Sequence, residues 1–261
     1  MRIVRTLLVL LLLMANTHPI HATSSGKSIL FIHHSTGGNL IKEGNLRDEV
    51  EKLDPAVELW DHNYNLSPIF PLLLANITHQ KGLSDAEGTV TGKDYNIVLS
   101  NNSPEEYADI FSRDPSDSTL TAVLEYDVIA FKNCYPTTRI ISDQQLEEDI
   151  KYYTIIRDNL QKYPENQFIL LTPPPSRKES TTIDDAKRAM ALVAWLNSDE
   201  FLQGASNIHV FDFFSMLADK DGMLKHEYQR MLPWDSHPNK QANLAVAPAF
   251  AEFLVKRANF R

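Results

Sequence analysis

Apolar and polar positions along this chain form two kinds of segment. Short runs rich in β-branched, aromatic and leucine residues end in polar or turn-forming residues, which predicts buried strands. They cover residues 28–34, 57–63, 127–133, 167–173 and 208–214. Longer segments place apolar residues three or four positions apart, which predicts amphipathic helices. They cover residues 39–53, 144–163, 184–196 and 240–256.

The helix expected over residues 144–163 shows the pattern most clearly. Leu146, Ile150, Tyr153 and Ile156 fall on one face, and Asp143 stands where an N-cap is expected. Strands that are almost continuously apolar and alternate with such helices are typical of a parallel sheet covered on both faces. The sequence therefore predicts an α/β fold of flavodoxin-like, three-layer, doubly wound type, with a mainly parallel five-stranded sheet.

One segment departs from this alternation. About sixty residues, 64–126, separate the second and third predicted strands, which is longer than an ordinary crossover. We interpret part of it as an insertion beside the functional site. Residues 94–100 (DYNIVLS) could add a strand, and the Asn-Asn-Ser-Pro sequence at 101–104 predicts a turn.

The first 22 residues have the features of an export signal. Arg2 and Arg5 precede an apolar run over residues 7–15, which is too short to span a bilayer, and the segment ends at Ala22. We therefore expect cleavage near Ala22, a single mature domain over residues 23–261, and a secreted or periplasmic location.

Charge narrows the classes of partner. The chain has 25 basic and 34 acidic residues, a net charge of −9. Removing the two arginines of residues 1–22 leaves 23 − 34 = −11. This balance disfavours binding to nucleic acid or, after signal cleavage, to an anionic membrane. Cys134 is the only cysteine, so neither an intramolecular disulfide nor a cysteine-based zinc site is expected.

A candidate nucleophile follows the first predicted strand. Ser35 stands at a strand-to-loop turn, and Gly37 and Gly38 come shortly after it. Glycines let backbone N–H groups approach a substrate oxygen, and a helix N-terminus adds positive potential there. Capping of the following helix by Ser35 is the structural alternative.

A second candidate segment, residues 234–239 (WDSHPN), immediately precedes the last predicted helix. Histidine can take the proton of a serine hydroxyl, and a nearby carboxylate fixes its tautomer and stabilises the imidazolium that forms. His237 and Asp235 supply these two groups. A loop with a solvated aspartate and an incidental histidine is the alternative reading.

Together, the two segments resemble the SGNH/GDSL-type hydrolases. In that superfamily the nucleophilic serine follows the first strand, an asparagine follows a later strand, and Asp and His precede the last helix in an Asp-x-x-His-Pro-Asn sequence. Ser35, Asn133 and Asp235 with His237 stand in corresponding places. The resemblance implies that Ser35 is the nucleophile, His237 the acid–base and Asp235 its partner. It also implies that Asn133, with backbone N–H groups at Ser35 and Gly37, binds the oxyanion.

The sequence departs from that superfamily at several positions. The usual Gly-Asp-Ser is His33-His34-Ser35, and Asp235 precedes His237 by two residues rather than three, so Asp212 is a reserve candidate for the acid. The glycine expected after the second strand is missing, and Asn63 or Asn65 could replace it as a donor.

Substrate contacts are expected from residues beside these segments. We assign His34, Asn63 and Trp234 to the binding of a small-molecule or carbohydrate ester. No cofactor is expected, because a serine mechanism requires none, and no phosphate-binding glycine motif indicates nucleotide binding.

Three functions remain open from the sequence. The leading one is an exported serine esterase that acts through an acyl-enzyme, for example on acetylated carbohydrate, with acyl transfer as a variant. A protein of this fold that binds carbohydrate without catalysis would place Ser35 well over about 4 Å from His237. A metal-dependent hydrolase would bring His33 or His34, Asp61 and His237 to one point.

Overall fold

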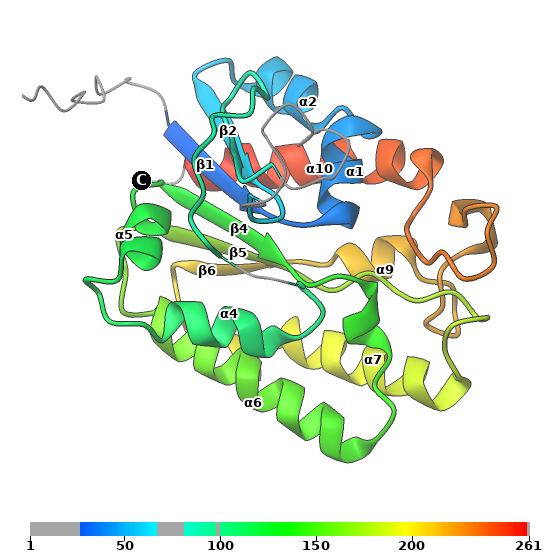
Figure 1. Ribbon diagram of the computed structural model, residues 1–261. Helices are drawn as coiled ribbons and strands as arrows, with labels where there is room; N and C mark the ends of the chain where they lie inside the picture. The colour runs from blue at the N-terminus through cyan, green and yellow to red at the C-terminus, as the bar shows by residue number, and fades with distance from the viewer. Residues whose placement is uncertain (1–26, 67–80, 98–99, 260–261) are drawn as a thin grey trace, which may run out of the picture.

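The computed structural model describes residues 27–66, 81–97 and 100–259 (Figure 1). The predicted signal segment, residues 1–22, lies outside the described residues. No helix in the described ranges is both long and apolar enough to cross a membrane.

The centre of the molecule is a mainly parallel, six-stranded sheet (Figure 1). Its strand order is β3-β2-β1-β4-β5-β6, and the only antiparallel neighbours in it are β2 and β3. The strands are β1 (Lys27–Ile32), β2 (Val57–His62), β3 (Leu83–Ser84), β4 (Val128–Lys132), β5 (Gln167–Leu171) and β6 (Ile208–Phe211). Chain order reverses direction at β1, where β2 lies on one side and β4 on the other, so β1 marks the topological switch point.

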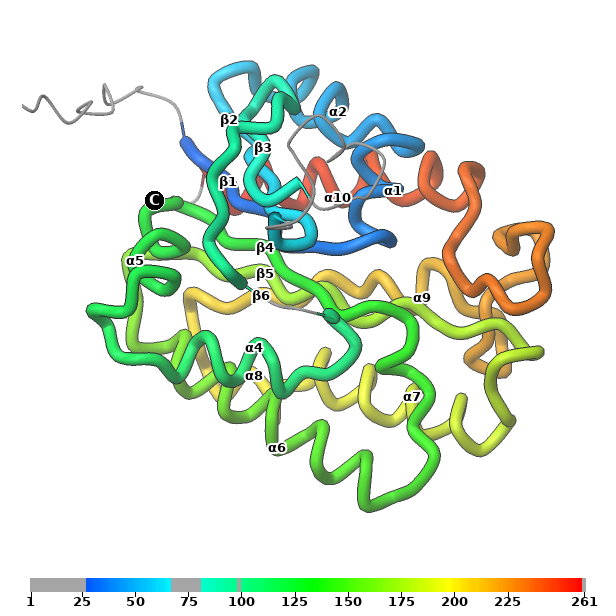
Figure 2. Tube along the Cα trace, in the orientation of Figure 1, coloured from blue at the N-terminus to red at the C-terminus, as the bar shows by residue number. Residues whose placement is uncertain are grey.

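The sixth strand was not predicted. β3 has only two residues and lies beside β2 (Figure 2). Its ladder to β2 pairs Asp61 with Ser84 and His62 with Leu83. A strand of two residues is too short to show an alternation of apolar and polar residues in the sequence. The extra strand expected over residues 94–100 is absent from its described part, residues 94–97 and 100, while residues 98 and 99 lie outside the described ranges.

Helices cover both faces of the sheet, as the alternating pattern predicted. On one face lie α1 (Ser35–Lys42), α2 (Leu46–Leu53) and α10 (Lys240–Ala258), and on the other α4 (Pro104–Phe111), α6 (Asp143–Leu160) and α7 (Ile183–Leu196) (Figure 1). The shorter helices are α5 (Ser118–Leu124), η2 (Tyr135–Thr138), α8 (Asp199–Leu202), α9 (Phe213–Leu217) and η3 (His226–Tyr228).

β1 shows why helices must pack on both faces of the sheet. Side chains alternate along a strand. Ile29 and Phe31 join the apolar cluster beneath α1, α2 and α10, whereas Leu30 and Ile32 join the cluster on the α4 and α6 side. All four are almost completely buried, so β1 contributes to two cores at once.

Two helix boundaries differ from the sequence prediction. The single helix expected over residues 39–53 is two helices, because Asn45 adopts a left-handed backbone with φ of 56° and stops α1 from continuing into α2. Gly44 permits the turn, since a Cβ there would lie 2.6 Å from the carbonyl oxygen of Leu40. In α6 the cap is Ser142, which accepts from the N–H of Gln145, and Asp143 is the first helical residue.

The long segment between β2 and β4 contributes to the core. Its helix α4 carries Tyr107, Ile110 and Phe111, which are buried in the same apolar cluster as Phe131 of β4. Ser103 caps this helix and Pro104 begins it, so the predicted turn at residues 101–104 leads directly into a helix. Part of the segment is therefore the crossover that connects two parallel strands.

Candidate active site

The proposed catalytic residues lie beyond the carboxyl ends of the parallel strands. Ile32 is paired with both His62 of β2 and Phe131 of β4, so the residues after these three strands meet at one edge of the sheet. Ser35 follows β1 by two residues and is the first residue of α1. His237 is 202 positions away from Ser35 in sequence and lies on residues 229–239, the loop that leads into α10 and is called the histidine loop below.

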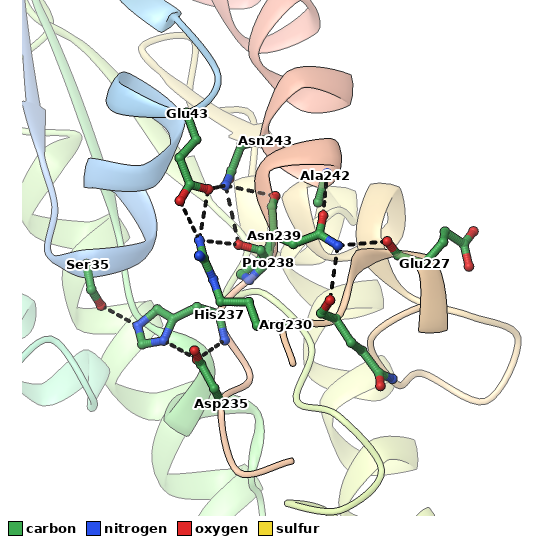
Figure 3. Close-up of polar contacts among 11 residues, drawn as sticks. Ser35, Glu43, Glu227, Arg230, Asp235, His237, Pro238, Asn239, Ala242 and Asn243 are labelled. Atoms are coloured by element: carbon green, nitrogen blue, oxygen red, sulfur yellow. Dashed lines mark hydrogen bonds and ion pairs between the residues drawn. The ribbon is translucent and has the colours of Figure 1, made fainter. Parts of the chain in front are cut away.

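Ser35, His237 and Asp235 form a continuous chain of hydrogen bonds (Figure 3). The Oγ atom of Ser35 is 2.7 Å from Nε2 of His237, and Nδ1 of His237 is 2.6 Å from Oδ1 of Asp235. A carboxylate can only accept hydrogen bonds, so Nδ1 of His237 donates to Asp235. Nε2 of the neutral ring then accepts the hydrogen bond from the Ser35 hydroxyl. This is the tautomer that a general base for Ser35 requires.

The short Asp-x-His spacing is accommodated by a tight local turn. Oδ1 of Asp235 also accepts from the backbone N–H of His237, at 3.0 Å. One carboxylate oxygen thus holds both the main chain and the ring of the same histidine. Asp212, the reserve candidate, instead caps α9 by accepting from the N–H of Ser215, and it also accepts from the Thr172 hydroxyl.

Cys134 is a neighbour of this chain. Its Sγ atom is 3.1 Å from Oγ1 of Thr36 and 3.8 Å from Oγ of Ser35, and the side chain is buried. Burial would raise the pKa of the thiol, but the positive charge of Lys132, the neighbouring His237 and the hydrogen bond with Thr36 outweigh it and lower the pKa to about 6.

The same contacts act on the imidazole. Burial would lower the pKa of His237, but the neighbouring Cys134 and the hydrogen-bonded carboxylate of Asp235 outweigh burial and raise the pKa above its ordinary value. Tyr135 stands edge-on to the ring, with centroids 5.0 Å apart. The ring is therefore enclosed on several sides, which favours one orientation.

An ion-pair network anchors the histidine loop to α1 and α10 (Figure 3). Nη2 of Arg230 donates to both carboxylate oxygens of Glu43 at 2.8 Å and to the carbonyl oxygen of Pro238 at 2.9 Å. Nδ2 of Asn243 donates to Glu43 at 2.7 Å. Asn239 caps α10 by accepting from the N–H of Ala242. Because Pro238 directly follows His237, these bonds fix the position of the imidazole.

The N-terminus of α1 offers donors for an oxyanion. The first hydrogen bond within this turn runs from the N–H of Gly38 to the carbonyl of His34, and no side chain caps the helix. The N–H groups of Ser35, Thr36 and Gly37 precede that bond, where a helix leaves its donors unpaired. Gly37 also has a steric role, because a Cβ there would lie 2.3 Å from Cβ of His33.

Asn133, expected in the oxyanion site, has other partners. Its Nδ2 donates to the carbonyl of Ser103 at 2.9 Å, and its Oδ1 accepts from the hydroxyl of Tyr153 at 3.0 Å. The side chain is completely buried. In this arrangement the amide ties the start of α4 to α6, which is the structural role that a buried amide commonly has.

Asn63 is better placed than Asn133 to contact a substrate. It lines the same cavity as Ser35 and His237, and a Cβ on Gly38 would lie 3.7 Å from its Nδ2. Its backbone N–H already donates to Gly82, so only the side-chain amide remains as a donor. Asn65 is occupied elsewhere, because it accepts from the N–H of Ile97 and donates to Asn96.

The other two expected substrate contacts do not line the cavity. His34 is 1% exposed and stacks on Tyr64 at 3.8 Å between ring centroids. Burial, with the nearby charge of Lys132, lowers the pKa of His34 to about 3, so the ring is neutral. Trp234 is 69% exposed on the outer surface of the histidine loop. Neither side chain lines this cavity, since adjacent residues in a loop point in different directions, and their assignment to the substrate stays a prediction.

A second buried pair, His33 and Asp61, also lines the cavity. Nε2 of His33 is 2.9 Å from Oδ2 of Asp61, and the other Asp61 oxygen accepts from Arg47. Burial would raise the pKa of Asp61, but His33 and Arg47 outweigh it and lower the pKa. His237 faces Ser35 and Asp235 instead. In residues 27–66, 81–97 and 100–259, no three His, Cys, Asp or Glu side chains converge as a metal site requires.

The cavity in front of the serine has a volume of about 480 Å³. Ser35, Asp235 and His237 line it together with charged residues that the sequence analysis did not single out. These are Lys42, Glu43, Arg47, Lys81 and Arg230. Cys134 and Thr36 were also missed as neighbours of the serine. The only feature of the sequence that could have identified them is that Cys134 directly follows Asn133 and Thr36 directly follows Ser35.

Comparison with known proteins identifies the fold. No model of a known protein family matches the chain, and no curated protein matches it in sequence. A GDSL-like lipase from Bacteroides thetaiotaomicron matches in structure with a TM-score of 0.52 at 10% identity, covering 88% of each chain. An acylhydrolase from Bacteroides fragilis matches with a TM-score of 0.48 at 11% identity, over 89% of this chain and 88% of that one. This chain has the fold of the SGNH/GDSL-type hydrolases.

Proposed function

We propose that this protein is a serine-dependent carboxylic ester hydrolase that acts through an acyl-enzyme. The observation that supports it most directly is the 2.7 Å contact between Oγ of Ser35 and Nε2 of His237, completed by the 2.6 Å contact to Asp235. A protein of this fold without catalytic function would have no need of that alignment. The same contact is the opposite of what the binding-only alternative predicts.

The proposed reaction has two halves. Oγ of Ser35 attacks the ester carbonyl while His237 takes its proton, and the tetrahedral intermediate expels the alcohol, which receives that proton from His237. Water then attacks the acyl-serine with His237 again as base, and the acid leaves as Ser35 regains its proton. Asp235 stabilises the imidazolium in both halves.

The oxyanion of each intermediate needs several donors. The N–H groups at the start of α1 and the Nδ2 of Asn63 are our candidates, since Asn133 is occupied by Ser103 and Tyr153. Donors fixed before the reaction are worth about 3 kcal/mol each in comparable sites.

The substrate and location are part of the proposal. A small acyl group, such as acetyl, carried by a carbohydrate alcohol suits a cavity lined mostly by residues with polar or charged side chains. The basic and apolar composition of residues 1–22 supports export, to the periplasm or outside the cell. Acyl transfer would use the same residues, with a sugar hydroxyl in place of water as the group that attacks the acyl-serine.

Hydrolysis of 4-nitrophenyl acetate tests the proposal. Ser35→Ala should lower kcat/KM by at least about 10³-fold while the melting temperature stays close to that of the parent protein. Ser206→Ala is the matched control, because Ser206 is exposed and distant from His237 in the fold. Activity that survives Ser35→Ala but disappears with a chelator would contradict the proposal in favour of a metal mechanism.

A further inference from the structure

The cavity in front of Ser35 carries a concentration of positive charge. Four basic side chains line it, from α1, α2, the segment before β3 and the histidine loop. They are Lys42, Arg47, Lys81 and Arg230. The acidic residues of the lining are Glu43, Asp61 and Asp235. Which of the four cations are neutralised decides what the cavity can bind.

The two arginines are paired. Arg47 donates to Asp61 and to the carbonyl oxygens of Leu59 and Ala86, so its guanidinium is engaged within the protein. Arg230 donates to both oxygens of Glu43. Asp235 is engaged by His237. These contacts use all three carboxylates of the lining.

The two lysines are not paired in this way. Across the described ranges, neither Lys42 nor Lys81 has a hydrogen bond or an ion pair. Lys42 is exposed at the end of α1, and Lys81 is half-buried. Burial lowers the pKa of Lys81, and the charges of Lys42 and Arg47 lower it further, while Asp61 opposes them. The lysines therefore lie close enough to repel one another across the cavity.

This local charge is opposite to that of the whole chain. The protein has a net charge of −9, so an anionic substrate approaching at random is repelled. Two unpaired ammonium groups in the cavity that Ser35 lines reverse the sign of the charge where a substrate must lie. Holding like charges together costs free energy, and a bound anion removes that cost.

We infer that the ester hydrolysed at Ser35 carries an anionic group, a carboxylate or a phosphate, which the ammonium groups of Lys42 and Lys81 bind in this cavity. The inference rests on the proposed function and names its substrate class. An ammonium binds either group as a point charge, whereas a planar fork such as that of Arg47 would favour bidentate geometry.

Matched sugar esters provide the test. The probes are 3-O-acetylglucose, 3-O-acetylglucuronate and 3-O-acetylglucose 6-phosphate, which differ only at carbon 6. The parent protein should hydrolyse one or both charged esters with kcat/KM about five- to tenfold above that of the neutral ester. The preference should shrink as NaCl rises from about 20 mM to about 500 mM. Comparison of the two charged esters distinguishes carboxylate from phosphate.

Two variants locate the effect. Lys42→Gln and Lys81→Gln, alone and combined, should bring kcat/KM for the charged esters to within about twofold of that for the neutral ester, compared within each variant. Lys151→Gln is the matched control, because Lys151 is exposed on α6, on the other face of the sheet. A charged ester preferred equally by the double variant would overturn the inference, as would the absence of any preference in the parent.

A binding measurement separates this inference from the proposed function. Calorimetry with Ser35→Ala should show tighter binding of glucuronate or glucose 6-phosphate than of glucose, and the double lysine change should remove the difference. This preference without ester hydrolysis would mean that the anion site stands and the esterase proposal fails. Ester hydrolysis without a charge preference in either assay would mean that the esterase proposal stands and the anion site fails.

Discussion

Two polar regions lie at the carboxyl edge of the sheet, and they differ in how their groups are partnered. In the first, Ser35, His237 and Asp235 are joined in series and open onto the cavity. In the second, beneath α6, Asn133 and Tyr153 are completely buried, and one oxygen of Asp149 has no partner within the described residues. Both regions stand next to residues that follow parallel strands.

The difference shows that position at a strand end does not assign a role. Ser35 and Asn133 each match the residue order of the superfamily, yet only Ser35 faces a proton acceptor. The amide of Asn133 is taken up by a helix hydroxyl and a loop carbonyl. We therefore expect changes in the first region to act on catalysis and changes in the second to act mainly on stability.

The largest effect is expected at Asp235. Asp235→Asn should lower kcat/KM by about 10²- to 10⁴-fold, because the amide no longer stabilises the imidazolium. The negative charge of Asp235 contributes to the raised pKa of His237, and the base acts only when neutral. The rise of kcat/KM with pH, measured from about pH 5 to about pH 9, should therefore move to lower pH in the variant.

Asp212→Asn is the control for that measurement, since Asp212 caps α9 and does not contact His237. Full activity in Asp235→Asn with loss in Asp212→Asn would reverse the assignment of the acid.

A smaller effect, on stability, is expected at Asn133. Asn133→Ala should lower the free energy of unfolding by about 2–3 kcal/mol, because the hydroxyl of Tyr153 and the carbonyl of Ser103 lose their partner in a buried site. Urea unfolding measures this loss, and kcat should change by less than about tenfold.

Tyr153→Phe sharpens this test, because it breaks one of the same hydrogen bonds from the side of α6. Tyr153→Phe should lower the free energy of unfolding by about 1–2 kcal/mol and leave kcat unchanged. If Asn133→Ala instead lowered kcat by more than about 10²-fold while Tyr153→Phe did not, Asn133 would be an oxyanion donor after all.

The smallest effect is expected at Asp149. Burial, with the nearby charge of Glu148, raises its pKa from 3.8 to about 7. Between those values the folded protein holds a proton that the unfolded chain has released, so this residue's contribution to stability is lost as pH rises. Asp149→Asn should therefore raise the free energy of unfolding by about 1–2 kcal/mol at about pH 8 and by almost nothing at about pH 4.

Urea unfolding at both pH values checks this expectation. Glu147→Gln removes a neighbouring exposed carboxylate and should change stability little at either pH. An Asp149→Asn gain of equal size at both pH values would rule out a titration effect.

Strong local patterns in the sequence predicted most of the fold. The five long strands, the doubly wound arrangement and helices α6, α7 and α10 follow from hydrophobic period alone. The break between α1 and α2 was missed because the amphipathic pattern continues through it, while the left-handed Asn45 and the crowded Gly44 interrupt the backbone. β3 was missed because two residues carry no period.

The sequence by itself determined which residue types are available for chemistry and which strand ends present them. Ser35, Asp235 and His237 could be chosen because their order and neighbours are local features of the chain. The tertiary structure alone decided which of these groups meet, that Asn133 turns to Tyr153, and that Lys42 and Lys81 line one cavity with the serine. Side-chain direction and charge pairing depend on contacts between segments up to 202 residues apart, and no local pattern in a sequence encodes them.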